Sequence, residues 1–162
     1  MPGYIMSLRA VVGHRPLLQV GASVILEDAQ GRVLLQKRRD NGCWGYHGGS
    51  VELDEIVEEA AARELFEETG IVAESLQLFG LFSGPQLHHK YPNGDEVSNV
   101  DAVYLCRQWH GTLRPQQEEV EELAFFAADA LPDSITPPNI PALQKWQRLK
   151  LNEQESNQHE ES

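Results

Sequence analysis

Three glutamates in the segment 48–71, GGSVELDEIVEEAAARELFEETGI, have the residue type and spacing of a metal site. Glu64, Glu67 and Glu68 stand at positions i, i+3 and i+4, which lie on the same face of an α-helix. Carboxylates this close repel one another, so either protonation or a multivalent cation must neutralise them. Ligation by oxygen alone suits a hard cation, and the segment therefore predicts a Mg²⁺ site, with Mn²⁺ as a substitute.

The helix that carries these glutamates is predicted over residues 55–69. Asp54 is a suitable N-cap, and Gly70 can end the helix in the left-handed conformation. On a helical wheel the three glutamates share an arc with the apolar residues Val57, Ala60 and Ala61. The acidic face therefore continues the buried face, which disfavours a reading of the segment as a solvated charge run.

The rest of the chain predicts strands and helices that alternate, around a glycine-rich loop at 40–49 that leads into the acidic helix. Two hairpin turns are predicted, one at 28–32 and one at Asn93-Gly94. Helices are predicted at 4–12 and 138–151, and strands at 17–28, 33–39, 76–84, 100–109 and 123–129. This order predicts an α/β fold.

Composition limits the domain count and the partners. The 162 residues are 41% hydrophobic and 23% charged, which suits one globular domain over 1–150. Residues 152–162 contain no apolar side chain, so 151–162 is predicted to be a disordered acidic tail. The net charge of −12 excludes nonspecific binding to nucleic acid or to a membrane surface. With two cysteines and no signal-peptide pattern, a cytoplasmic location is expected.

The acidic segment resembles the Nudix box of the Nudix (MutT-like) hydrolases, over 49–71. The box is a glycine, five residues, Glu, seven residues, then Arg-Glu-apolar-any-Glu-Glu-any-Gly-apolar. Every position matches, and the matching residues are Gly49, Glu55, Arg63, Glu64, Leu65, Glu67, Glu68, Gly70 and Ile71. The resemblance implies an α/β/α sandwich around a mixed β-sheet.

The resemblance also implies an activity and a role for each residue of the box. The activity is the Mg²⁺-dependent hydrolysis of a nucleoside diphosphate linked to another moiety. The metal ligands and catalytic acids would be the carboxylates of Glu64, Glu67 and Glu68, helped by the backbone carbonyl of Gly48. Glu55 and Arg63 would brace the loop against the helix, and Glu52 would support the site.

A further acid and the substrate contacts are less specific. Family members often use a glutamate before the last strand as a base or a metal ligand, and here Glu118, Glu119, Glu121 and Glu122 are available, with Glu119 favoured. Arg38 and Arg39 could meet phosphates, and Trp44, Tyr46 or Tyr91 could stack on a base. His47 and Asp54 depart from the commoner form of the box, which has proline and glycine there, and His47 could reach the substrate.

Two classes of function remain open from the sequence. The first is a pyrophosphohydrolase, whose substrate could be an ordinary or oxidised (d)NTP, ADP-ribose or a dinucleoside polyphosphate. The second is a noncatalytic nucleotide-sensing module on the same scaffold, which the three intact glutamates disfavour. A homodimer is possible, as in many relatives.

Overall fold

Strands β1 (Leu17–Leu26) and β2 (Val33–Arg38) each contribute side chains to two separate cores in the computed structural model, which describes residues 3–160. Successive side chains of a strand point to opposite faces, so Val24 and Leu26 enter one core while Ile25 enters the other. Leu34 and Leu35 divide in the same way. Both faces of these strands are therefore covered, which explains their nearly continuous apolar sequence.

The strands form two sheets. One sheet is mixed, because β1 pairs with β7 in parallel and every other pairing in it is antiparallel. Its order is β4 (His47–Ser50), β1, β7 (Glu96–Gly111) and β5 (Ile71–Phe82), and the short strand β6 (His88–Lys90) also pairs with β7. The second sheet is antiparallel, with the order β3 (Trp44–Gly45), β2 and β8 (Val120–Phe126).

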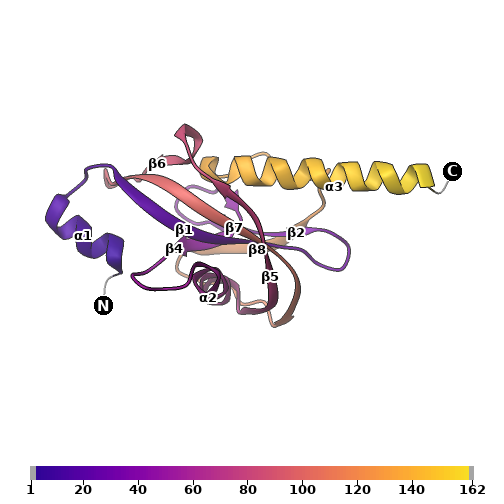
Figure 1. Cartoon of the computed structure of the whole chain (residues 1–162), viewed down its shortest axis with the longest axis horizontal. Helices are drawn as coiled ribbons and strands as arrows, with labels where there is room; N and C mark the ends of the chain where they lie inside the picture. The colour runs from indigo at the N-terminus through magenta and orange to yellow at the C-terminus, as the bar shows by residue number, and fades with distance from the viewer. Residues whose placement is uncertain (1–2, 161–162) are drawn as a thin grey trace.

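Helices cover the sheets on opposite sides (Figure 1). α2 (Val57–Thr69) buries Ala61 and Leu65 in one core, and α3 (Ile140–Glu160) buries Leu143 and Trp146 in the other. α1 (Tyr4–Val12) lies at the end of the molecule away from the C-terminus of α3 (Figure 1). Two short 3₁₀ turns, Pro85–Leu87 and Pro137–Asn139, complete the elements. The predicted α/β/α sandwich around a mixed sheet is confirmed.

Most local predictions are confirmed, and the acidic helix, its loop and the C-terminal tail supply the exceptions. The glycine-rich segment is not simply a loop, because it contains β3 and β4, and Gly48 pairs with Ser23 of β1. The helix begins at Val57 and not at residue 55. Asp54 is not its N-cap, since Asp54 lies in the left-handed region with φ 63°. That conformation explains why glycine is frequent at this position of the box.

α3 continues through residues 151–160, where the sequence predicts a disordered tail. The polar residues there are adequate helix formers, and they extend a helix that is already nucleated and packed through Trp146. Residues 161–162 of the predicted tail lie outside the described residues. None of the described helices combines the length and the apolar composition that a membrane crossing requires.

A buried carboxylate fastens α3 to the mixed sheet. Glu27, which directly follows β1, is 3% exposed. It accepts hydrogen bonds from Trp146 Nε1 at 2.7 Å and from Arg107 Nε at 3.1 Å, and it pairs with Lys150 Nζ at 2.9 Å. This network joins residues that are far apart in the chain, so it stabilises the fold and not one local element.

We expect Glu27→Ala to lower the free energy of unfolding by about 3–5 kcal/mol, because it leaves a buried indole N–H and a largely buried ammonium without their acceptor. Glu153→Ala is the matched control, since Glu153 also contacts Lys150 but is 58% exposed in its side chain. The control should change stability by no more than about 0.5 kcal/mol in urea denaturation. Equal effects of the two substitutions would contradict the structural role of Glu27.

Candidate functional site

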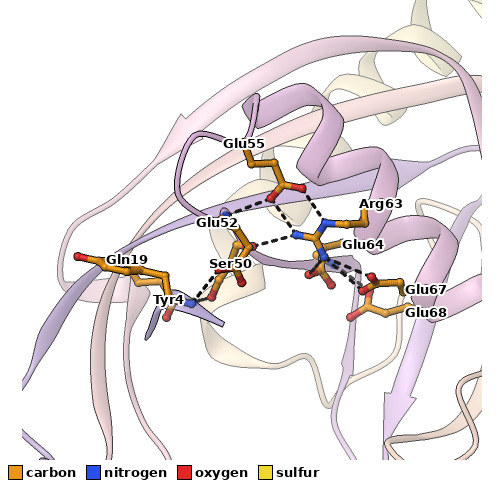
Figure 2. Close-up of polar contacts among 10 residues, drawn as sticks. Tyr4, Gln19, Ser50, Glu52, Glu55, Arg63, Glu64, Glu67 and Glu68 are labelled. Carbon is orange, nitrogen blue, oxygen red and sulfur yellow. Dashed lines mark hydrogen bonds and ion pairs between the residues drawn. The ribbon is translucent and has the colours of Figure 1, made fainter. Parts of the chain in front are cut away.

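Arg63 lies at the centre of the acidic segment and holds the loop before α2 against the helix. Its guanidinium donates two hydrogen bonds to the Glu55 carboxylate, from Nε at 2.7 Å and from Nη2 at 3.0 Å. It also donates to Glu64 at 2.9 Å and to the carbonyl of Ser50 at 3.2 Å, and it contacts Glu67 at 3.3 Å. Figure 2 shows these groups converging on the one guanidinium. The predicted pairing of Glu55 with Arg63 is present.

This arrangement has the expected electrostatic consequences. The hydrogen bonds that Arg63 donates to Glu55 hold the pKa of Glu55 below its usual range and raise the pKa of Arg63. The Glu55 carboxylate also accepts a hydrogen bond from the backbone N–H of Glu52 at 3.1 Å. The loop at 50–55 is therefore fixed to α2 through charge-assisted hydrogen bonds, which are stronger than neutral ones.

Glu64 and Glu68 lie side by side in a partly buried environment. Burial, helped by the charges of Glu64 and Glu119, raises the pKa of Glu68 to about 8, although a hydrogen bond from the backbone N–H of Gly48 at 2.9 Å opposes this shift. Burial also raises the pKa of Glu64, against the opposing effect of Arg63. Two adjacent carboxylates are thus held where their negative charge is costly.

Two glycines of β4 permit close contacts with neighbouring elements, one with α2 and one with β1. A side chain at Gly49 would place its Cβ within 2.5–2.7 Å of the Glu64 carboxyl group, so the close approach of Glu64 to β4 requires glycine. A Cβ at Gly48 would meet Ser23 and would lie 2.7 Å from the backbone oxygen of Ala22. Gly49 therefore allows Glu64 to approach β4, and Gly48 allows β4 to pair with β1.

Among residues 3–160, no three acidic, His or Cys side chains converge closely enough to form a ready-made metal cage. Glu64 and Glu67 turn instead toward Arg63, and Glu67 is 53% exposed, so water competes for its contact. The donor chemistry nevertheless fits a hard cation: Glu64 and Glu68 are partly buried oxygen donors with unfavourable mutual charge. The roles of these acids and of the Gly48 carbonyl as metal ligands remain predictions.

Glu119 and Glu52 lie in different surroundings. Glu119 is exposed on the loop before β8, near enough for its charge to raise the pKa of Glu68. Glu52, which was expected to support the metal site, instead accepts a hydrogen bond from the backbone N–H of Tyr4 at 2.8 Å and so caps the start of α1. Figure 2 shows Glu52 facing Tyr4 rather than the group around Arg63. The carboxylate of Glu52 is therefore engaged by α1.

A cleft of about 160 Å³ opens beside Glu68, Gly48 and Gly49, and we call it the polar cleft. Asp101 lies inside it, 7% exposed, and accepts hydrogen bonds from Ser23 Oγ at 2.8 Å and Tyr46 Oη at 3.0 Å. Burial raises the pKa of Asp101, and the two hydrogen bonds oppose that effect. Asn139 also lines the cleft, and its Oδ1 accepts from the backbone N–H of Tyr46 at 3.0 Å. The cleft thus offers oriented carboxyl, amide and hydroxyl groups.

The arginines predicted to meet the substrate differ in position. Arg38 lines the polar cleft, where it forms a forked pair with Asp40 at 2.9–3.0 Å. Arg39 does not line this cleft; it donates from Nε to the carbonyl of Gln117 at 2.7 Å. Arg39 therefore fastens the loop before β8, which carries Glu119, to the end of β2.

The predicted substrate contact of His47 is wrong, because its side chain is fully buried, whereas that of the half-buried Trp44 stays a prediction. Trp44 packs edge-on against Phe126 at 4.9 Å, next to the core beneath α3. His47 is 0% exposed, its Nε2 donates to the carbonyl of Leu34 at 3.1 Å, and burial lowers its pKa to about 4. Its Nδ1 lies 3.3 Å from the amide of Gln36, which in turn hydrogen-bonds Glu68. The imidazole is neutral and positions Gln36 behind Glu68.

Sequence reasoning missed Asp101 and Asn139. A signal for Asp101 was present, because a single acid within the apolar strand sequence VDAVYLC has to be buried with partners. Asn139 stands in a Pro-Pro-Asn turn before α3, and nothing local distinguishes it from an ordinary turn residue. Only the fold brings it beside Tyr46.

A three-layer sandwich that presents a glycine-flanked helix of acids beside a polar cleft defines the class of Nudix-type proteins. The family model described as NUDIX domain matches residues 17–146, and the chain belongs to the Nudix family. The crystal structure of a MutT NUDIX hydrolase from Burkholderia pseudomallei has a TM-score of 0.68 and 35% identity, covering 80% of this chain and 97% of that one.

Two curated relatives carry names that state an activity. An ADP-ribose pyrophosphatase of Methanocaldococcus jannaschii is 36% identical over 104 residues, which are 62% of this chain and 57% of that protein. An oxidized purine nucleoside triphosphate hydrolase of Mus musculus is 32% identical over 111 residues, 63% of this chain and 66% of that protein. The match therefore spans less than two thirds of the length of either relative.

The two glycines of β4 predict separable effects. We expect Gly49→Ala to fold with nearly unchanged stability, because the flexible Glu64 side chain can move aside, but to bind Mg²⁺ about 10-fold to 100-fold more weakly. Gly48→Ala should instead lose about 1–3 kcal/mol of unfolding free energy, since its Cβ meets the backbone of β1. Titration calorimetry and thermal unfolding measure the two effects. Unchanged Mg²⁺ binding by Gly49→Ala would contradict the role given to this glycine.

Arg63→Lys should lower the free energy of unfolding by about 1–2 kcal/mol, because a lysine cannot form the forked contact with Glu55 or reach Ser50 at the same time. Arg148→Lys on the exposed face of α3 is the control and should change stability by less than about 0.5 kcal/mol. Urea denaturation of the two variants provides the comparison. If both variants unfold at the wild-type midpoint, Arg63 does not fix the loop.

Proposed function

We propose that this protein is a divalent-metal-dependent hydrolase that cleaves the diphosphate bond of a nucleoside diphosphate linked to another moiety. The observation that carries the proposal is the position of Glu64 and Glu68, two adjacent and partly buried carboxylates, of which Glu68 lines the polar cleft. Their combined negative charge is unfavourable without a cation, and Mg²⁺, with Mn²⁺ as a substitute, suits such oxygen donors. Membership of the Nudix family supports the same reaction.

In this proposal Glu64, Glu67, Glu68 and the carbonyl of Gly48 hold the cation. When bound, it lowers the pKa of a water molecule and neutralises charge on the diphosphate oxygens. Because burial raises the pKa of Glu68 to about 8, a proton and a cation would compete for its carboxylate at neutral pH. Arg63 keeps Glu64 and Glu67 on the same side of α2, as in Figure 2.

The remaining groups position the substrate. Asp101 and Asn139 offer hydrogen bonds to a base or sugar in the polar cleft, and Gln36 is oriented between His47 and Glu68. Glu119 lies close enough to influence the charge of Glu68, so it is the acid of its loop that we propose as the base or as a further ligand. Glu121 lies 3.9 Å from Lys37 and is better explained as a surface pair.

The names of relatives suggest substrates without choosing between them. One relative is named for ADP-ribose and another for oxidized purine nucleoside triphosphates, and both kinds of molecule contain a nucleoside joined to a diphosphate. We therefore propose the broad class, nucleotides and nucleotide derivatives. The alternative function, a noncatalytic nucleotide-sensing module, is less well supported, because Glu64, Glu67, Glu68 and Arg63 are all present.

The decisive experiment combines metal removal with one substitution. The wild type should hydrolyse at least one of ADP-ribose, dGTP or diadenosine polyphosphate with Mg²⁺, and EDTA should abolish the activity. Glu67→Gln should reduce kcat/KM by about 10²-fold or more, because losing a ligand removes several kcal/mol of charge stabilisation. Phosphate and nucleotide products are measured by chromatography.

Glu59→Gln is the matched control, since Glu59 lies on the exposed face of the same helix. It should retain the wild-type rate. Binding of a nucleotide without turnover in Mg²⁺ or Mn²⁺ would favour the sensing module instead. Equal rates for Glu67→Gln and Glu59→Gln would show that Glu67 is not a metal ligand.

A further inference from the structure

A second cleft, of about 590 Å³, lies on the other side of the acidic site, and we call it the α1 cleft. Glu64 lines the α1 cleft, whereas Glu68 lines the polar cleft. Gln19 and Tyr91 line both clefts, so the two are neighbours that meet beside the acids of α2. A diphosphate held at these acids would therefore have one cleft at each end.

The wall of the α1 cleft is formed by an element outside the region that matches the family model, which begins at residue 17. Ile5 and Met6 of α1 contribute to this wall, opposite Val97 of β7. Tyr91 adds an aromatic ring from the hairpin between β6 and β7. The lining is thus more apolar than that of the polar cleft.

Hydrogen bonds attach α1 to the rest of the domain near both of its ends, which holds this wall in place. At its start, the backbone N–H of Tyr4 donates to Glu52, and Gly3 leaves room for that carboxylate, as a Cβ there would collide with it. Near its end, the buried Arg9 guanidinium donates to the backbone carbonyls of Gly13, Arg15 and Glu96. Figure 2 shows Tyr4 beside Glu52, with Gln19 next to Ser50.

The charges of this cleft select against a phosphate. Of the described residues that line it, Arg9 is the one cation, and its guanidinium is already occupied by three carbonyls and lies 3.7 Å from Asp95. Glu52 and Asp95 supply negative charge to the same walls, beyond Glu64, whose charge the proposed cation would offset. An anionic group that extended beyond the metal site would be repelled, whereas an uncharged ring would pack against Met6 and Tyr91.

We infer that the α1 cleft binds the second moiety of the substrate, and that this moiety is an uncharged ring such as a sugar or nucleoside. The inference rests on the proposed function and narrows it. It favours nucleoside diphosphates that are capped by such a ring over nucleoside triphosphates, whose terminal phosphates would face the acids of the cleft.

The test fills the cleft without touching the acids of α2. Met6→Trp places a large ring on its wall, and Val11→Trp is the matched control, because Val11 lies on the same helix, is 83% exposed and does not line the cleft. ADP-ribose and diadenosine diphosphate serve as ring-capped probes, and ATP and dGTP as triphosphate probes. KM and kcat are measured with Mg²⁺, and dissociation constants are measured with Ca²⁺, with thermal unfolding as a check on folding.

The wild type should have a higher kcat/KM for the ring-capped probes than for the triphosphates. Met6→Trp should raise KM for the ring-capped probes about tenfold or more and leave kcat little changed, because it blocks one apolar contact surface. The kinetic constants for the triphosphates should stay within about twofold of the wild type. Val11→Trp should leave all constants unchanged. A preference of the wild type for triphosphates, or equal effects of Met6→Trp on all probes, would overturn the inference.

Failure of the proposed function has a different signature. If the wild type turns over none of the probes with any metal, the hydrolase proposal fails. The dissociation constants still test the cleft in that case: Met6→Trp should weaken binding of the ring-capped probes alone. Unchanged binding of those probes would then overturn the inference as well.

Discussion

The hydrogen bonds between Arg63 and its acceptors are the interaction on which the site depends. The guanidinium satisfies Glu55, Glu64 and a loop carbonyl simultaneously, and it contacts Glu67. It therefore does two things at once: it closes the loop that follows β4, and it offsets the repulsion among acids that a helix places one turn apart. A planar group with five donors is suited to this arrangement, which a lysine could not reproduce.

The two glycines of β4, the buried histidine and the N-terminal helix are all connected to the network around Arg63. Glu64 can remain beside Arg63 only because Gly49 has no side chain, and Glu68 is held by the backbone of Gly48 and by Gln36. His47, buried and neutral, keeps Gln36 in place from behind. α1 then uses Glu52, in the loop that Arg63 closes, as its own N-terminal acceptor. A local network of hydrogen bonds thus connects the acids of α2 to the outermost helix of the molecule.

How far the sequence could predict this arrangement depends on whether a residue acts through local or distant contacts. The box residues were predictable, because helical periodicity and charge determine where Glu64, Glu67 and Glu68 lie relative to one another. His47 was misplaced because the neighbouring strands determine which side of a short strand is buried. Asp54 was assigned as a cap from its residue type, whereas the turn there requires a positive φ. The helical conformation of 151–160 was missed because the composition of this segment does not show that it extends a helix already packed against the core.

The parallel pairing of β1 with β7 has a kinetic consequence. Ser23 meets Asp101 across 78 positions of the chain, and Glu27 meets Trp146 across 119. Contacts of such long range form slowly, since a large loop must close before they stabilise anything. α2 can form its first turns early from local interactions, yet the cleft beside its acids exists only after the strands have met. The acids of α2 can therefore be brought together by local structure before the cleft beside them has formed.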